Sequence, residues 1–387
     1  MAWGKVNLKE QKELFIQSYF ENKFTLSDLC RQFDISRPTA YKWVERFKLN
    51  GPEGLKEHSK EPFHSPNKIP SWKEEEILKI KYSWPNWGPN KVLGHLLNKR
   101  TDVDWPSKTS IENIFKKHGL VKKRKLRKRF AAAENPLVEC NSSNDIWCFD
   151  FKGWWITNDK QKCEPFTLMD AYSRYLICCQ NMFIKDSVHV WAIMERLFKE
   201  HGLPLRVRSD NGPPFATFGA GRLSKLSIKL IKSGVMPEWI EPGEPQQNGR
   251  HERMHLTLKN EAVDLSVDLK TQIKKLNEFT EYYNHERPHE ALNHKCPGDI
   301  YQQSSRYWDG KLRSPEYSND YQIRKVKSCG KMSWKMGEVY VGRAFEGEPI
   351  GIKLEEGNLK AYYGHIFLGN VKDGALDFER RLGRRRK

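Results

Sequence analysis

The chain has 387 residues, and its 67 Lys and Arg against 49 Asp and Glu give it a formal net charge of +18. An apolar fraction of 38%, with 13 Trp, 14 Tyr and 19 Phe, is enough to form packed cores and excludes a wholly disordered chain. The sequence contains neither a membrane-length apolar run nor the apolar stretch of a secretory signal, so we expect a cytoplasmic protein with no membrane partner. Because basic residues are in excess, nucleic acid is the expected partner.

The eight cysteines include no Cys-x-x-Cys pair. Such pairs are typical of zinc ribbons and fingers, and disulfide frameworks are typical of secreted domains. We therefore expect neither a structural zinc site nor disulfide bonds.

Residues 1–56 predict a helix-turn-helix DNA-binding domain. Apolar residues at helical spacing precede Thr25, which can cap a second helix, and Ser36 can cap a third. This third helix would enter the major groove of DNA by its N-terminal end. The candidate DNA contacts on it are Arg37, Thr39 and Lys42. A plain helical hairpin, in which these side chains only face solvent, is the alternative.

A linker that contains Pro, Ser and Lys is expected at 57–70, and residues 71–120 predict a second helix-turn-helix domain. Its helices are expected at 72–82, 90–97 and 107–117. The candidate DNA contacts at the start of the last helix are Ser107, Lys108 and Thr109. Two such domains in tandem suit a DNA site longer than one helical turn.

Residues 121–143 form a basic linker in which seven of eight consecutive residues are Lys or Arg. We favour a segment that follows DNA phosphates, which would make binding strongly dependent on salt, over a solvated tether or a nuclear-import signal. The basic residues are Lys122, Lys123, Arg124, Lys125, Arg127, Lys128 and Arg129.

From residue 144 to about residue 303 the pattern predicts a mixed α/β domain. Its strands are expected at 146–151, 166–170, 175–182, 205–210 and 236–240, and its helices at 187–200, 223–232, 248–264 and 269–284. Residues 304–375 predict a small all-β barrel or sandwich of the SH3-like type, with strands at 332–340, 349–354 and 359–367. Residues 376–387 form a basic tail.

Three carboxylates carry the chemical signal. Asp150 lies in a strand beside two Phe and two Trp, where an ionised carboxylate is costly unless it is paired or holds a metal. Asp210 ends another strand, although its Asp-Asn-Gly sequence also suits a simple turn. Glu252 begins a helix on which His255 and Lys259 would share its face. Together the carboxylates suit two divalent cations that act on a phosphodiester.

Six motifs in this region follow one another in the order found in one family. They are Trp147-x-x-Asp150-x-Lys152, Asp170-x-x-Ser173-Arg174, Ser209-Asp210-Asn211-Gly212-x-x-Phe215, Pro245-x-x-Asn248-Gly249-x-x-Glu252, Leu258-Lys259-x-Glu261 and Tyr283-Asn284-His285-Glu286-Arg287-Pro288. Over residues 144–301 the chain therefore resembles the integrase core of bacterial insertion-sequence transposases, in the superfamily of retroviral integrases with an RNase H-like fold. The tandem helix-turn-helix front end is also similar to that family.

The resemblance implies a DDE transposase. It assigns catalysis and metal binding to Asp150, Asp210 and Glu252, with two Mg²⁺ ions as cofactor and Mn²⁺ as a substitute. Lys259 would contact DNA near the cleaved phosphate, and Asp170 would be structural. The enzyme would bind the terminal inverted repeats of its element, cut each end, and join the 3′-hydroxyl to target DNA. Because two ends are joined, a homodimer or larger multimer on double-stranded DNA is implied, associated with the bacterial nucleoid.

Two features depart from the family pattern. The gap of 41 residues between Asp210 and Glu252 is longer than in close relatives, and we expect the insertion to form a flexible loop at 215–226. The N-terminus also lacks the His/Cys zinc site of retroviral integrases. Two rival functions stay open: a regulator or inactive transposase that only binds DNA, and an RNase H-type nuclease that cuts hybrids or branched DNA.

Overall fold

The computed structural model describes residues 8–57, 68–121, 137–241, 244–335, 337–372 and 374–378. The chain divides into two compact units, Met1–Lys68 and Ile69–Lys387, which we call unit 1 and unit 2. The basic run from Lys122 to Arg129 and the basic tail beyond residue 378 lie outside the described residues, so their roles stay predictions. In the described ranges, no helix is both long and apolar enough to cross a membrane.

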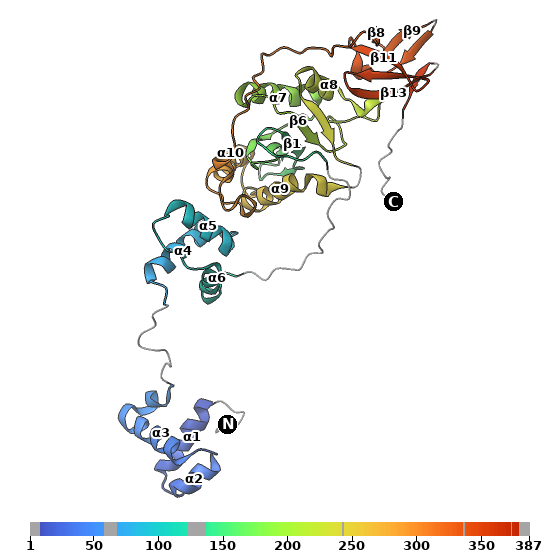
Figure 1. Ribbon diagram of the computed structural model, residues 1–387. Helices are drawn as coiled ribbons and strands as arrows, with labels where there is room; N and C mark the ends of the chain where they lie inside the picture. Colours follow the sequence, from blue (N-terminus) through green and yellow to red (C-terminus); the bar gives the residue numbers. More distant parts are fainter. Residues whose placement is uncertain are drawn as a thin grey trace. The chain divides into compact units, whose positions relative to one another are not determined.

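The described part of unit 1 is a small helical domain (Figure 1). Its helices are α1 (Leu8–Phe20), α2 (Leu26–Gln32) and α3 (Arg37–Asn50), followed by the 3₁₀ turn η1 (Gly51–Leu55). The backbone N–H of Asp28 donates to Thr25 Oγ1 at 3.3 Å, which caps α2. The N–H of Thr39 donates to Ser36 Oγ at 3.4 Å, which caps α3. These are the helices and caps that the sequence predicts.

Unit 2 begins with a helical module, which consists of α4 (Ser71–Ser83), α5 (Pro89–Lys99) and α6 (Lys108–Lys117). Ser107, which was predicted as the first residue of this helix, instead caps α6, because its Oγ accepts a hydrogen bond from the N–H of Ser110 at 3.3 Å. The module packs on the rest of unit 2. The Trp87 indole N–H donates to the hydroxyl of Tyr282 at 2.7 Å, and Trp84 stacks on the Tyr282 ring with centroids 4.1 Å apart.

A mixed five-stranded sheet forms the centre of unit 2 (Figure 1). Its strands, in spatial order, are β5 (Leu176–Asn181), β4 (Pro165–Asp170), β1 (Ile146–Phe151), β6 (Arg206–Ser209) and β7 (Met236–Trp239). β1 is antiparallel to β4 and parallel to β6, which is parallel to β7. The hairpin of β2 (Trp155–Ile156) and β3 (Lys162–Cys163) was not predicted, because strands of two residues show no alternation.

Helices cover both faces of this sheet. α7 (Ser187–His201) and α8 (Lys225–Lys232) pack on one face, and α9 (Gly249–Glu261) and α10 (Leu269–His285) pack on the other (Figure 1). Side chains alternate along β1, so Trp147 and Phe149 face α7 and α8 while Asp150 faces α9. This is the predicted α/β arrangement, with element bounds that differ from the prediction by a few residues.

Among the described residues, the C-terminal strands form a seven-stranded sheet that curls into a nearly closed barrel. In spatial order they are β8 (Gln322–Lys325), β11 (Pro349–Glu355), β12 (Asn358–Tyr363), β13 (Ile366–Lys372), β14 (Ala375–Asp377), β10 (Gly337–Tyr340) and β9 (Lys331–Trp334). The edge strands β8 and β9 lie close together, which nearly closes the sheet.

The prediction of one continuous strand at 332–340 and another at 359–367 is wrong, because each range is a hairpin. The first is the hairpin of β9 and β10, which turns at Lys335 with φ of 50°. The second is the hairpin of β12 and β13, which turns at Gly364 with φ of 57°. Apolar and aromatic residues flank both turns closely, so the sequence pattern predicts one strand for each run although Gly337 and Gly364 lie at the reversals.

The expected insertion at 215–226 is packed rather than flexible. Ala216 and Leu223 pair in a β-bridge across the 3₁₀ turn η2 (Ala220–Arg222). Ala220 and Leu223, each about 1% exposed, lie in the apolar core of the barrel together with Leu368. The prediction of a flexible loop is wrong because these apolar side chains are buried against the barrel.

A buried ion pair fixes the last turn of α9. Arg287 donates to both carboxylate oxygens of Glu261, at 3.1 and 3.2 Å, and the two side chains are only 7% and 10% exposed. The hydroxyl of Tyr282 donates to the same carboxylate at 3.1 Å. Because Tyr282 also accepts from Trp87, this cluster joins α9, α10 and the helical module.

We expect Arg287→Met to destabilise unit 2 by about 3–5 kcal/mol, because it leaves the Glu261 carboxylate buried without its partner. Replacing both residues by methionine should cost less than this single change. The control, Arg196→Met, breaks an exposed pair with Glu200 and should cost less than about 1 kcal/mol. Calorimetric unfolding of the full chain measures all three, and equal effects of the two single changes would contradict the interpretation.

Candidate active site

Asp150 and Asp210 lie at matched ends of neighbouring parallel strands. The register of β1 and β6 pairs Ile146 with Arg206 and Cys148 with Arg208. Continued by two residues, this register sets Asp150 beside Asp210, on strands spaced about 4.8 Å apart. The two predicted aspartates are therefore brought together by the sheet.

Glu252 reaches the same region from the first turn of α9, a helix that packs against β1. Burial raises the pKa of Asp150 to about 7, with further contributions from the negative charges of Asp210 and Glu252. A hydrogen bond from the N–H of Phe151 at 2.7 Å and the charge of Lys152 act in the opposite direction. Burial also raises the pKa of Asp210. The three carboxylates thus form one electrostatically coupled group.

This group has almost no basic partner. Among the described residues, no Lys or Arg pairs with Asp150, Asp210 or Glu252 within 4.0 Å, and the nearest basic atom is His255 Nδ1, 4.0 Å from Asp150 Oδ2. Carboxylate oxygens are the donors that hard divalent cations prefer. In the described part of the chain, however, no three acidic, His or Cys side chains are already gathered closely enough to hold a metal. The donor chemistry fits such a cation, and the side chains would have to close around it.

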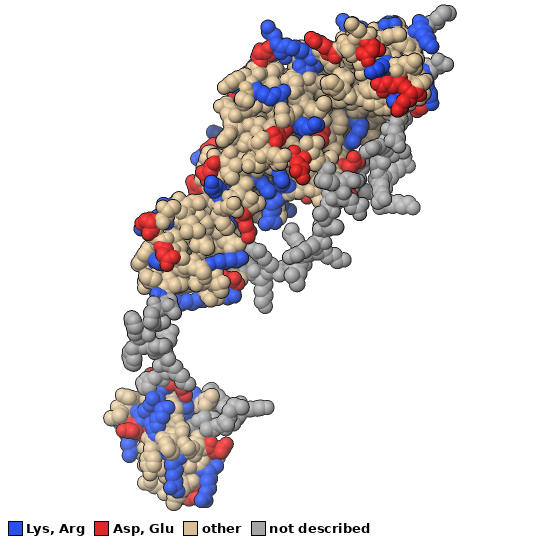
Figure 2. Space-filling model, viewed as in Figure 1, with Lys and Arg blue, Asp and Glu red and all other residues tan. Residues whose placement is uncertain are grey.

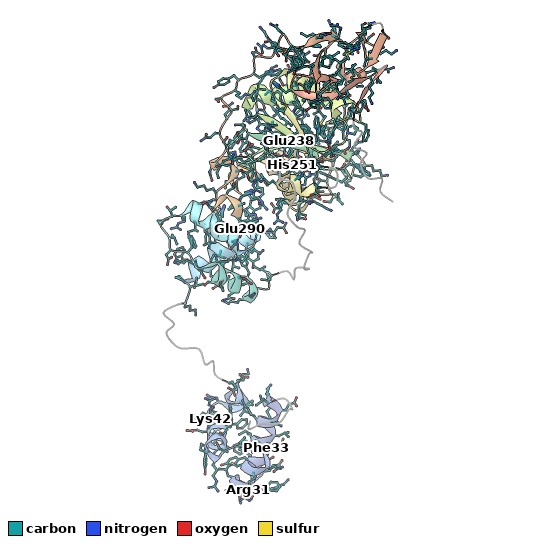
Figure 3. All side chains as sticks on the ribbon, turned by 45° about the vertical axis from the view of Figure 1, so that its right-hand side comes forward. Arg31, Phe33, Lys42, Glu238, His251 and Glu290 are labelled. Carbon is teal, nitrogen blue, oxygen red and sulfur yellow. The ribbon has the colours of Figure 1, made fainter. Side chains whose placement is uncertain are left out.

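The predicted shared face of α9 is only partly correct. Glu252 and Lys259 are exposed, but His255 is only 8% exposed and turns toward the sheet. His251, which is labelled in Figure 3 and was not singled out from the sequence, is fully buried and contacts Thr167 of the sheet. Because α9 lies on the sheet, the residues one turn apart at 251 and 255 face inward together.

Two lysines lie near each other beside the carboxylates, and Lys152 is the one whose charge acts on Asp150. The predicted Lys259 is exposed on α9, and Lys152 follows β1 and is half-buried. Burial lowers the pKa of Lys152, and the charge of Lys259 lowers it further. Lys152 could have been singled out from the sequence, because it follows a carboxylate at a strand end by two residues. No role was predicted for it. Both ammonium groups are suited to a phosphate beside the carboxylates.

Asp170, expected to be structural, is fully buried at the last position of β4, opposite Trp147 of β1. It accepts hydrogen bonds from the N–H groups of Asn144 and Ser173, both at 2.8 Å, and from the Ser173 hydroxyl at 2.6 Å. All three partners are internal, so Asp170 stabilises the backbone at this end of the sheet.

The candidate DNA contacts of both helical regions lie at helix starts. Arg37 and Lys42 on α3 are exposed, whereas Thr39 is half-buried and bonds Ser36 Oγ at 2.8 Å. Lys42 lies at the surface of unit 1 in Figure 3, and Figure 2 shows several groups of Lys and Arg on the visible face of this unit. Ser107 and the following residues Lys108 and Thr109 are exposed at the start of α6.

Family models match successive parts of the chain. Two models described as integrase core domain match residues 141–245 and 233–297. Residues 141–297 are therefore similar to an integrase core. A helix-turn-helix domain matches residues 11–62, a homeodomain-like domain matches 39–115, and the C-terminal domain of IS481 family transposases matches 321–373. The predicted fold class, with helix-turn-helix regions before an integrase core and a small β domain after it, is confirmed.

Relatives of the chain are encoded by insertion elements. An uncharacterized 31.7 kDa protein of IS407 from Burkholderia multivorans is 24% identical over 194 residues, which cover 49% of this chain and 67% of the relative. An uncharacterized 39.2 kDa protein of IS476 from Xanthomonas euvesicatoria is 26% identical over 184 residues, which cover 46% of this chain and 51% of the relative. The chain thus spans about two thirds and one half of their lengths. The predicted resemblance to insertion-sequence transposases is confirmed.

Solved structures similar to the integrase core come from retroviruses. The HTLV-2 integrase catalytic core domain in complex with magnesium, in its trimeric form, is 16% identical, with a TM-score of 0.34, and the match covers 42% of this chain and 98% of that chain. The simian T-cell lymphotropic virus intasome in complex with the PP2A regulatory subunit B56 gamma is 14% identical, with a TM-score of 0.37, and the match covers 77% of this chain and 99% of that chain.

In metal-free buffer at pH 8, we expect Asp150→Asn to stabilise unit 2 by about 1 kcal/mol or more, because it removes a buried charge beside two like charges. The control is Asp145→Asn. Asp145 accepts hydrogen bonds from the N–H groups of Asn141 and Ser142, and its pKa is lowered although burial opposes the shift. This control should lower the melting temperature, and a similar loss in Asp150→Asn would contradict our electrostatic description of the site.

Proposed function

We propose that the chain is a DDE transposase of an insertion sequence, which binds the terminal inverted repeats of its own element and cuts and joins DNA there. One observation carries this proposal: Asp150 and Asp210 end neighbouring parallel strands beside the helix of Glu252 and have no Lys or Arg partner among the described residues. Carboxylates that repel one another in the free protein are suited to a site completed by cations.

Asp150, Asp210 and Glu252 would hold two Mg²⁺ ions, with Mn²⁺ as a substitute. When bound, the ions would offset the repulsion and stabilise the attacking and leaving oxygens of a phosphodiester. Lys152 and Lys259 would hold the DNA backbone beside the carboxylates by contacts to phosphate oxygens. The two aspartates would be held in place by the sheet. To complete the site, only the Glu252 side chain and the DNA would have to move toward them.

The chemistry proceeds in two displacements at phosphorus. Water attacks the phosphodiester at the element end, the bond between phosphorus and O3′ breaks, and the end keeps a 3′-hydroxyl. In the second step this hydroxyl oxygen attacks a target phosphodiester and displaces the target's own 3′-hydroxyl. One phosphodiester forms as one breaks, so the chain needs only to hold both phosphates in line and no covalent link to the protein arises.

The N-terminal end of α3 in unit 1 would read the element end in the major groove, and the start of α6 would contact a second stretch of DNA. The two ends of one element are joined to the same target, so a homodimer or larger multimer would assemble on the DNA. A protein with this function works on the bacterial chromosome, in the cytoplasm at the nucleoid.

A strand-transfer assay tests the proposed reaction. The substrates are labelled duplexes from the DNA that flanks the gene, with a supercoiled plasmid as target and Mg²⁺ in the buffer. We expect joined product from the wild type and a loss of at least about a hundredfold in Asp210→Asn, because the substitution removes one carboxylate ligand. In the same samples, Mg²⁺ should raise the melting temperature of the wild type more than that of the variant.

Three other outcomes would overturn this proposal. Tight, sequence-specific binding without joining would indicate a regulator or inactive transposase. Cleavage of RNA–DNA hybrids but not of duplex ends would indicate an RNase H-type nuclease. Joining that persists in Asp210→Asn would show that the chemistry lies elsewhere.

Binding to the element end tests the role of α3. We expect Lys42→Ala to weaken binding and to reduce the slope of log affinity against log salt by about 1, because one phosphate contact is lost. Lys23→Ala, at an exposed lysine that pairs with Glu21 outside α3, serves as control and should leave the slope unchanged. Equal slopes for the two variants would exclude a phosphate contact at Lys42.

A further inference from the structure

One hydroxyl lies between the strand of Asp150 and the helix of Glu252. Thr167 of β4 is fully buried and directly opposite Asp150 in the pairing of β1 with β4. Its Oγ1 is 3.0 Å from the backbone carbonyl oxygen of Asp150, 2.8 Å from His251 Nε2 and 2.7 Å from His255 Nε2. A single side chain therefore contacts both elements that carry the carboxylates.

The chemistry of these contacts assigns every proton. A carbonyl oxygen can only accept, so the one proton of the Thr167 hydroxyl goes to Asp150. The two imidazoles must then both donate through Nε2–H to the lone pairs of Oγ1. Both Nε2 atoms lie within hydrogen-bonding distance of Oγ1, and an imidazole with its ring proton on Nε2 can make this donation.

The remaining ring nitrogens follow from this assignment. His251 Nδ1 bears a lone pair, is buried, and has no hydrogen-bond partner in the described structure. His255 Nδ1 bears a lone pair that faces Asp150 Oδ2 at 4.0 Å. Within the described residues, Thr167 is thus the hydrogen-bond partner that the two rings share.

The two histidines stand on either side of Glu252 in the first turns of α9. They are four residues apart, so they lie on one face of the helix, with ring centroids 4.6 Å apart. Apolar packing alone would let α9 slide along the sheet, whereas hydrogen bonds are sensitive to both distance and angle. Two donors from one helix to one oxygen fix the height and the rotation of α9 over β1.

We infer that Thr167 is a positioning residue, which acts with His251 and His255 to set the separation between Asp150 and Glu252. The inference rests on the proposed function, because it concerns the same carboxylates. It links Thr167 to two histidines that follow it in the sequence by 84 and 88 positions. No motif in the chain connects these residues.

The decisive variant is Thr167→Val, which keeps the β-branched shape in the sheet and removes only the hydroxyl. We expect it to fold and to bind end DNA like the wild type, while its strand-transfer rate falls about 10- to 100-fold, because small displacements of reacting groups cost that much. The Mg²⁺ concentration at which its strand transfer is half-maximal should rise. Thr167→Ser, which restores the hydroxyl, should recover both properties.

The matched control is Thr157→Val. Thr157 is a buried threonine in the β2–β3 hairpin, away from α9, whose Oγ1 lies 2.5 Å from Asp159 Oδ1 and 3.0 Å from the carbonyl oxygen of Gln161. It should lose stability without a change in the Mg²⁺ requirement. The two variants are compared when their melting temperatures are equal. If Thr167→Val then shows the same strand-transfer rate and the same Mg²⁺ requirement as the control, the positioning role is overturned.

An NMR measurement tests the same network without any activity. Imidazole ¹⁵N spectra of the metal-free full chain should show the Nε2–H tautomer for both His251 and His255, and Thr167→Val should shift both signals. An Nδ1–H tautomer at either ring would overturn the assignment. If the wild type joins no DNA, the proposed function fails, and these spectra still decide whether the hydroxyl holds the two rings.

Discussion

The candidate site in unit 2 depends on two aspartates that the sheet holds side by side at the ends of parallel strands. Asp150 and Asp210 repel each other, and burial penalises each of them further. The opposite face of β1 opposes this repulsion, because Phe149 packs between Phe166 and Phe215 with ring centroids 5.9 and 4.4 Å away. A loosely packed sheet would let the charged ends separate, so the apolar layer under α7 and α8 is a precondition for the site.

Each carboxylate is also tied to a different neighbouring part of unit 2. The segment after Asp210 is buried in the barrel through Ala220 and Leu223. The helix of Glu252 is held at its start by Thr167 and at its end by Arg287, whose cluster reaches the helical module through Tyr282 and Trp87. A displacement of the barrel or of the module would therefore act on a different member of the site.

Local patterns were sufficient to predict most elements of the sheet and to single out three carboxylates that the structure brings to one region. Asp150 stood out because a charged residue in an apolar strand is costly, and that reason is visible in one strand alone. Thr167 and His251 could not be found in this way, since the hydroxyl and the ring meet across 84 residues and each is unremarkable in its own segment. Two other features were missed for a related reason. The hairpins of the barrel turn between closely spaced apolar residues, and the insertion is buried against a domain that is distant in the sequence. Neither feature produces a periodic pattern in its own segment.

The same charges bear on the choice between an enzyme and a protein that only binds DNA. The chain as a whole is strongly basic, yet the end of its central sheet holds carboxylates that would repel a DNA phosphate and that Lys152 and Lys259 do not pair with. A protein that only binds DNA has no use for charges that weaken both its own fold and its contact with the ligand. Cations bound at the carboxylates would remove both penalties at once, so the arrangement favours the proposed enzyme over a protein that only binds DNA.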